Sequence, residues 1–217
     1  MLMLGKARLN QTIFYHFMTY PLFAAGPEPY RQLCGCHELD VCPRSRLKEW
    51  LSFLGIHDKA GFETKLRWLF YEGHRCEFNE LSQRISTMSA AVRRQLLASF
   101  REDGETEHKL KCVNQWMHIL PPANIAAFDF ALLTALSRAG VRRRWLKESE
   151  ANGYCLEAAK MAQTNYTGWS DFFAACIAGA CFYFPQRNGD SLQLAYARSL
   201  LNISGAIPSI DWNHPLK

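Results

Sequence analysis

The chain has 217 residues, of which 48% are hydrophobic and 21% are charged, and its formal net charge is +5. This length allows one large domain or two small ones with a sizeable core, and the composition excludes a disordered chain. The charge is a mild excess, so its distribution along the chain is more informative than its size.

Residues 1–44 are interpreted as an amino-terminal extension. An apolar run over 13–25 follows Lys6 and Arg8, but polar residues and a proline interrupt it, and no small-residue cleavage pattern follows. These departures argue against an export signal. The most apolar stretch, 172–184, is shorter than the roughly twenty residues that a membrane span needs. We therefore expect a cytoplasmic protein without a membrane span.

A cysteine- and histidine-rich loop lies in this extension. Four of its side chains have the chemistry of tetrahedral zinc ligands: Cys34, Cys36, His37 and Cys42. Their C-x-C-H-x4-C spacing differs from the paired C-x2-C of common zinc modules. A cytoplasmic loop of reduced thiols needs no metal. We expect no cofactor, with zinc at this loop as the alternative hypothesis.

The rest of the chain, 45–217, is predicted to be helical. Leu47, Trp50, Leu51 and Leu54 form one apolar stripe with helical spacing, and Gly55 ends it. Strand-like alternation and hairpin turns are missing from the sequence. The pattern predicts an all-α, single compact multi-helix domain. Similar patterns predict helices over 47–54, 59–71, 89–97, 109–119, 124–139, 146–163, 170–184 and 191–202, with an extended tail over 207–215.

Polar side chains follow the apolar helix over 59–71. Gly73 halts that helix, and His74 and Arg75 come directly after it. A cationic pair at a helix C-terminus is stabilised by the helix dipole, by about 0.3–1 kcal/mol for each charge. This structural role accounts for the pair without any chemistry.

Asp129 lies inside an otherwise apolar helix, between Phe128 and Phe130. A buried carboxylate is costly unless a partner pairs with it. Arg138 is nine residues on, about two and a half turns away, so it cannot pair with Asp129 within the helix. Asp129 must therefore face solvent or find a partner such as His74 or Arg75.

The polar residues above and a basic run further along the chain suggest two alternative functions. An enzyme or small-anion-binding protein would gather His74, Arg75, Asp129 and Arg138 in a cleft between helices, although the sequence contains no established catalytic motif. An open pocket lined by the four would favour this hypothesis, whereas a closed ion-pair network would make them structural. Nucleic-acid binding through the basic run Arg142–Lys147 is the second alternative.

Several segments, taken in their order along the chain, resemble those of a known family. They are Gly73-His74-Arg75, Phe128-Asp129 with Arg138, Asn165–Trp169, and Gly179 with Phe182-Tyr183. Together they resemble the YbeU/YbeR-like bacterial family (domain of unknown function 1266), over roughly residues 45–212. The sequence departs from the family pattern at Leu132, where the family often has an arginine, and at Gly168, where it has a serine.

The resemblance implies a partner rather than a reaction. Genes of this kind are associated with bacterial secretion and polymorphic-toxin loci, which implies an immunity (antitoxin) or adaptor protein that occludes the active site of a cognate toxin. A chain at +5 suits a target with an acidic contact surface. We expect one protein partner, and the candidate contacts are aromatic and arginine residues: Arg142, Arg143, Arg144, Trp145, Tyr166 and Trp169.

Overall fold

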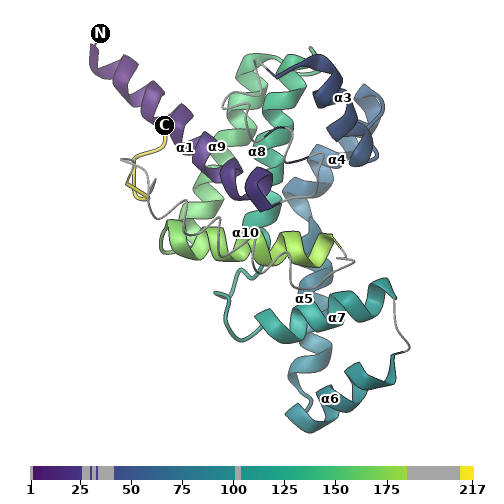
Figure 1. Ribbon diagram of the computed structural model, residues 1–217. Coiled ribbons are helices and arrows are strands. Elements are labelled where there is room, and N and C mark those ends of the chain that lie inside the picture. The colour runs from purple at the N-terminus through teal and green to yellow at the C-terminus, as the bar shows by residue number, and fades with distance from the viewer. Residues whose placement is uncertain (1, 26–29, 31–32, 34–41, 101–103, 185–210) are drawn as a thin grey trace.

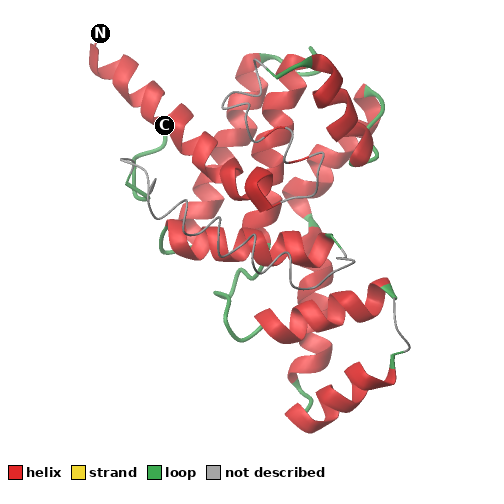
Figure 2. Cartoon of the chain, in the orientation of Figure 1, coloured by secondary structure: helices red, strands yellow, loops and turns green. Residues whose placement is uncertain are grey.

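The computed structural model describes residues 2–25, 30, 33, 42–100, 104–184 and 211–217 (Figure 1). Within these ranges the chain forms nine helices and no strand (Figure 2). The prediction of an all-α fold is confirmed. The helices are α1 (Leu2–Ala25), α3 (Arg44–Phe53), α4 (Lys59–Tyr71), α5 (His74–Ser86), α6 (Ala90–Ser99), α7 (Glu105–Trp116), α8 (Ala126–Arg142), α9 (Glu148–Asn165) and α10 (Trp169–Tyr183).

Helix α8 lies at the centre of the molecule. Its residues are buried almost without interruption from Ala126 to Gly140, and helices α1, α4, α5, α9 and α10 all pack against it. Small residues allow this close approach. A Cβ added at Gly140 would lie 2.5 Å from the Phe62 ring, and one added at Gly179 would lie 2.3 Å from the Cβ of Phe128. An all-round apolar helix is the expected solution for an element covered on every side.

Helix α1 contributes to the same core. The side chains of Phe14, Met18 and Leu22 are fully buried, and the ring of Phe14 lies 4.7 Å from that of Trp169. The sequence did not predict this helix, because polar residues and Pro21 interrupt its apolar run. The division of the chain at residue 44 stays a prediction.

Helices α5, α6 and α7 project from the rest of the molecule (Figure 1). A smaller apolar cluster holds them together, with Phe78, Ile85, Leu110 and Val113 buried against α10. Helix α6 packs mainly on α7 and has no buried residue of its own. This helical arm therefore presents much of its surface to solvent.

Most predicted helices are present, with ends that differ by a few residues. Helix 59–71 has the predicted bounds, and the helix predicted from residue 89 begins at Ala90, with Ser89 as its N-cap. Helix α5 was not predicted. The predicted helix 191–202 and the tail up to residue 210 lie outside the described residues. No described helix combines the length and apolarity that crossing a membrane requires.

Candidate functional site

The carboxylate of Asp129 is fully buried in the first turn of α8 and accepts four hydrogen bonds. Two come from backbone N–H groups, that of His74 at 2.9 Å and that of Arg75 at 3.0 Å. The other two come from side chains, His74 Nδ1 at 2.8 Å and Arg75 Nη1 at 3.2 Å. We call Asp129, His74 and Arg75 the buried cluster. Of the two outcomes expected for Asp129, the structure shows the paired one.

Asp129 caps helix α5 from a distance. The N-cap residue of α5 is Gly73, which has no side chain to satisfy the first N–H groups of the helix. The carboxylate of Asp129 takes that role and also lies at the positive end of the helix dipole. The helix therefore begins where α8 supplies the acceptor.

Gly73 is required at this position for two reasons. Its φ is +69°, a left-handed conformation that side-chain-bearing residues rarely adopt. A Cβ on it would lie 2.3 Å from Asp129 Oδ2 and 2.5 Å from Arg75 Nη1. The Gly-His-Arg segment is thus explained by local backbone geometry together with its contact with Asp129.

Arg75 joins two helix ends. Besides Asp129, its guanidinium donates to the carbonyl oxygens of Leu69 at 2.9 Å and Phe70 at 2.8 Å, in the last turn of α4. The predicted interaction with the end of this helix is therefore present for Arg75. For His74 the prediction is wrong, because His74 is the first residue of α5 and binds Asp129 instead.

The imidazole of His74 is buried among aromatic rings. Its centroid lies 4.3 Å from that of Tyr183, 4.8 Å from Trp68 and 5.2 Å from Phe128. Because a carboxylate oxygen only accepts, Nδ1 carries the hydrogen that is donated to Asp129. Within the described part of the chain, Nε2 is enclosed and has no hydrogen-bond partner.

Burial lowers the pKa of His74, and the nearby ammonium of Lys65 acts in the same direction. The hydrogen bond and charge of Asp129 oppose this shift but do not cancel it. Lys65 itself is partly buried, with Nζ 4.1 Å from the centre of the Trp68 ring. Burial also lowers the pKa of Lys65. The site therefore favours a neutral imidazole at neutral pH.

A carboxylate that orients an imidazole through Nδ1 and leaves Nε2 open is also the arrangement of a general base. Here, however, aromatic rings enclose Nε2, and Asp129 is inaccessible to solvent. Arg138 lies nine residues further along α8, about 13 Å from Asp129 along the helix axis, and the structure does not bring it into the buried cluster. The geometry is that of a closed network.

The basic run 142–147 is only partly exposed. Arg142 donates to the backbone oxygen of Cys42 at 3.5 Å, and the guanidinium of Arg143 lies 4.7 Å from the centre of the Trp145 ring. Trp145 in turn packs 5.3 Å from the Phe62 ring. Arg144 and Lys147 are exposed. Two of the three arginines are thus used within the protein.

Two predicted partner contacts lie in the core instead. Tyr166 and Trp169 are 3% and 7% exposed. The Tyr166 hydroxyl accepts the N–H of Ala127 at 2.8 Å and donates to the carbonyl oxygen of Asn124 at 2.9 Å. Tyr166 thus fixes the entry into α8, and Trp169 packs on the rings of Phe14 and Trp212. Because both are buried, they supply no contact surface.

The predicted zinc ligands Cys34, Cys36 and His37 lie outside the described residues. Cys42 is described and fully buried. Among the side chains that the structure describes, no group of three or more histidine, cysteine or acidic residues is placed to hold a metal ion. Zinc binding by the loop stays a prediction that metal analysis of the purified protein can check.

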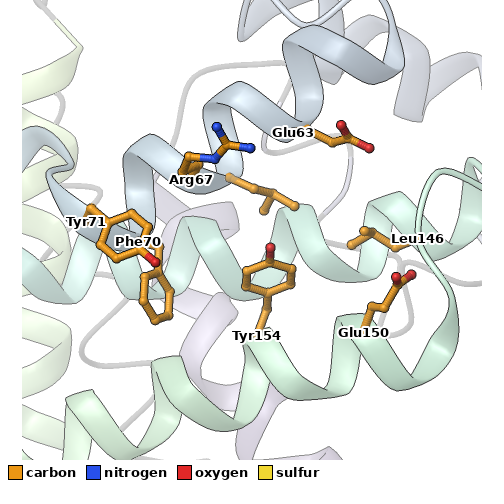
Figure 3. Close-up of a pocket in the computed structure, with 8 residues that line it drawn as sticks. Glu63, Arg67, Phe70, Tyr71, Leu146, Glu150 and Tyr154 are labelled. Carbon is orange, nitrogen blue, oxygen red and sulfur yellow. The ribbon is translucent and has the colours of Figure 1, made fainter.

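Sequence reasoning missed a groove on the surface between α4 and α9 (Figure 3). Its central hollow has a volume of about 380 Å³. Two further hollows, of about 370 and 360 Å³, share lining residues with the central one and therefore lie next to it. We call the three together the α4–α9 groove, and its central part is lined by Glu63, Leu66, Arg67, Phe70, Tyr71, Leu146, Glu150 and Tyr154.

Aromatic and charged side chains share this groove. Tyr154 rises from α9 toward α4, with Phe70 beside it at a centroid distance of 6.3 Å (Figure 3). Tyr71 stands at one end and is 72% exposed. Arg144 and Trp145 line the hollow at the other end. The only signal in the sequence was polar residues between the apolar positions of two helices, which is typical of any solvent-facing surface.

Comparison with known proteins assigns the chain to a family from its sequence alone. No curated protein and no solved structure matches it. Residues 47–212 match the family described as "Protein of unknown function (DUF1266)". This match includes the buried cluster and the residues that line the α4–α9 groove. The chain is a member of the DUF1266 family.

Proposed function

We propose that this chain is a non-enzymatic, cytoplasmic protein-binding protein, an immunity (antitoxin) or adaptor protein that occludes the active site of a cognate secreted bacterial toxin. The observation that supports this is the closed buried cluster. Asp129, His74 and Arg75 bind one another and two helix ends rather than an open cavity. Because these side chains bind one another and the helix ends, they stabilise the fold. Recognition of a protein partner then depends on exposed residues elsewhere.

Occlusion needs a stable exposed surface and no chemistry of its own. A specific complex buries about 800 Å² on each side, and a few aromatic and arginine residues supply most of the binding energy. The α4–α9 groove offers such residues on two helices that are both packed on α8. Arg144 and Trp145, which the sequence marked as candidate contacts, lie at one end of it.

Within the family, we further propose that the chain belongs with the YbeU/YbeR-like members. The Gly73-His74-Arg75 segment and its partner Asp129 support this assignment. The association of such genes with toxin loci is what suggests a toxin as the partner. The family match by itself names no function.

The test is co-purification. The tagged chain is expressed with its neighbouring genes in native cells, and bound proteins are identified by mass spectrometry. We expect one stoichiometric partner that is toxic when expressed alone and harmless when the chain is present. Recovery of the chain by itself, under conditions where the neighbouring proteins are expressed, would overturn the proposal.

The enzyme alternative has one favourable observation, the buried Nε2 of His74, which has no hydrogen-bond partner within the described part of the chain. It predicts that His74→Gln abolishes function while the protein remains folded. The proposed function predicts the reverse, because a folded His74→Gln variant still carries the groove. Toxin rescue by this variant, with its folding checked by circular dichroism, separates the two.

A further inference from the structure

The negatively charged side chains of the α4–α9 groove already have partners. Glu63 pairs with Lys59 at 3.5 Å, and Glu150 accepts the backbone N–H of Lys147, the N-cap residue of α9, at 2.7 Å. Glu157, at the far end, lies 3.8 Å from Lys160. Glu63 and Glu157 are thus paired with lysines, and Glu150 is bound at the N-terminus of α9.

Two of its positively charged side chains are available. Arg67 on α4 and Arg144 after α8 are both exposed, and no ion pair holds either of them within the described part of the chain. Arg67 extends along the groove beside Glu63 (Figure 3). The positive charge available to a partner therefore lies in the central hollow, at Arg67, and at the end of the groove that Arg144 lines.

Arg144 has an unusual backbone conformation for an arginine. Its φ is +59°, and its N–H bonds the Val141 carbonyl oxygen just after the end of α8. Glycine or asparagine usually occupies this left-handed position. A side chain there is strained, and strained residues concentrate at functional sites. This conformation holds the arginine at the rim, where it lines the groove.

The floor of the groove is apolar between these charges. Leu66 and Phe70 from α4 meet Tyr154 from α9, and Leu146 closes one side. The hollow beyond Phe70 and Tyr154 is also lined by Gly153 and Leu156. A hollow of this size accepts one aliphatic or aromatic side chain of a partner, with polar groups on either side.

We propose that the α4–α9 groove binds an acidic protein segment that inserts one apolar side chain beside Phe70 and Tyr154 and places its carboxylates on Arg67 and Arg144. This inference rests on the proposed function and names the chemistry of the partner. Bidentate pairing with carboxylates is the contact for which arginine is best suited. A nucleic acid would lay a continuous row of phosphates along the groove, also against Glu63 and Glu150, whereas a protein segment can place its carboxylates at the two arginines alone.

The direct test uses a short fluorescein-labelled peptide, rich in glutamate with one central phenylalanine, and measures its binding by fluorescence anisotropy at low salt. The comparison probes are the same peptide with lysine in place of glutamate, and a single-stranded oligodeoxynucleotide. We expect the acidic peptide alone to bind, and its binding to weaken as salt is added. Tighter binding of the basic peptide or of the oligonucleotide would overturn the proposal.

Matched variants locate the site. Arg67→Glu and Arg144→Glu should each weaken binding of the acidic peptide by about tenfold. Arg94→Glu is the control, because Arg94 is also an exposed helix arginine but lies on α6, at the opposite end of the molecule (Figure 1). An equal loss with Arg94→Glu would show non-specific attraction and overturn the groove as the site.

The same variants separate this inference from the proposed function. A co-purified toxin that binds Arg67→Glu and Arg144→Glu as tightly as the wild type would refute the groove and leave the immunity role intact. Specific peptide binding in the groove without any toxin partner would retain the acidic-segment site and remove the immunity role.

Discussion

The carboxylate of Asp129 accepts the backbone N–H of His74, 55 residues earlier in the chain, at 2.9 Å. One side chain of α8 thus starts α5, holds the His74 ring and pairs with Arg75, which itself binds the end of α4. Three helices meet at a single carboxylate. The stability of this junction should depend on that group more than on any exposed acid.

Replacing Asp129 tests this dependence. Asp129→Ala leaves buried N–H groups and the Arg75 guanidinium without their acceptor, so we expect the free energy of unfolding to fall by about 3–5 kcal/mol. Chemical denaturation measures the change. The exposed Glu49→Ala on α3 is the control and should alter stability by less than about 0.5 kcal/mol. Similar effects of the two substitutions would contradict the role given to Asp129.

Two glycines provide a second comparison. Gly55 and Gly73 have nearly the same φ, +72° and +69°, but a Cβ at Gly55 meets nothing within 4 Å, whereas one at Gly73 meets Asp129. Gly55→Ala should therefore cost only the backbone strain, about 1 kcal/mol. Gly73→Ala should cost that strain and disrupt the buried cluster as well. We expect a difference of at least about 2 kcal/mol in thermal or chemical unfolding, and equal costs would refute the contact.

The pH dependence of stability should report His74. In the unfolded chain this imidazole titrates near its ordinary value of 6.5, and in the folded protein its pKa is lower because of burial. The unfolded state therefore binds the proton more readily as pH falls below 6.5, so acid favours unfolding. The loss stops growing once the pH is below the lowered pKa of the folded state.

Melting temperatures measured between neutral and mildly acidic pH test this expectation. His74→Gln should flatten the decline of stability below pH 6.5, although it lowers stability overall. His57→Gln is the control, since His57 is exposed on the loop before α4. An unchanged pH profile in His74→Gln would mean that another group causes the acid sensitivity.

Arg144→Gly separates stability from binding. Glycine relieves the left-handed strain at this position, so the free energy of unfolding should rise, by up to about 1 kcal/mol. If Arg144 binds the partner, the same variant should bind it more weakly. A stabilised protein with full affinity would show that the strained conformation has no binding role.

The sequence predicted most helices because their signals are local. Helix 59–71 has an apolar stripe between Asp58, which caps it, and Gly73, which follows it, and all of these lie within the segment itself. Helix α5 has the apolar spacing of a helix, at Phe78, Leu81 and Ile85, but it has no local start signal. Its cap is Asp129, far away in the sequence, and its N-cap residue Gly73 has no side chain.

The same distinction applies to the site. The cost of burying Asp129 left two expectations, exposure to solvent or a partner such as His74 or Arg75, and the structure shows the partner. The sequence could not show that two backbone N–H groups also donate hydrogen bonds to this carboxylate. The α4–α9 groove was not predicted, because it depends on how α4 and α9 are set on α8, and neither helix encodes that spacing by itself.

Arg75 also links the interior to the surface, since it holds the carbonyl oxygen of Phe70, whose ring lines the groove. The backbone of this groove wall is thereby fixed from behind, while the exposed side chains of Arg67 and Arg144 take no part in fixing it. Natural selection can exchange those outward residues without endangering the fold. Related chains would then keep the Gly-His-Arg segment and its aspartate while their grooves diverge to recognise different partners.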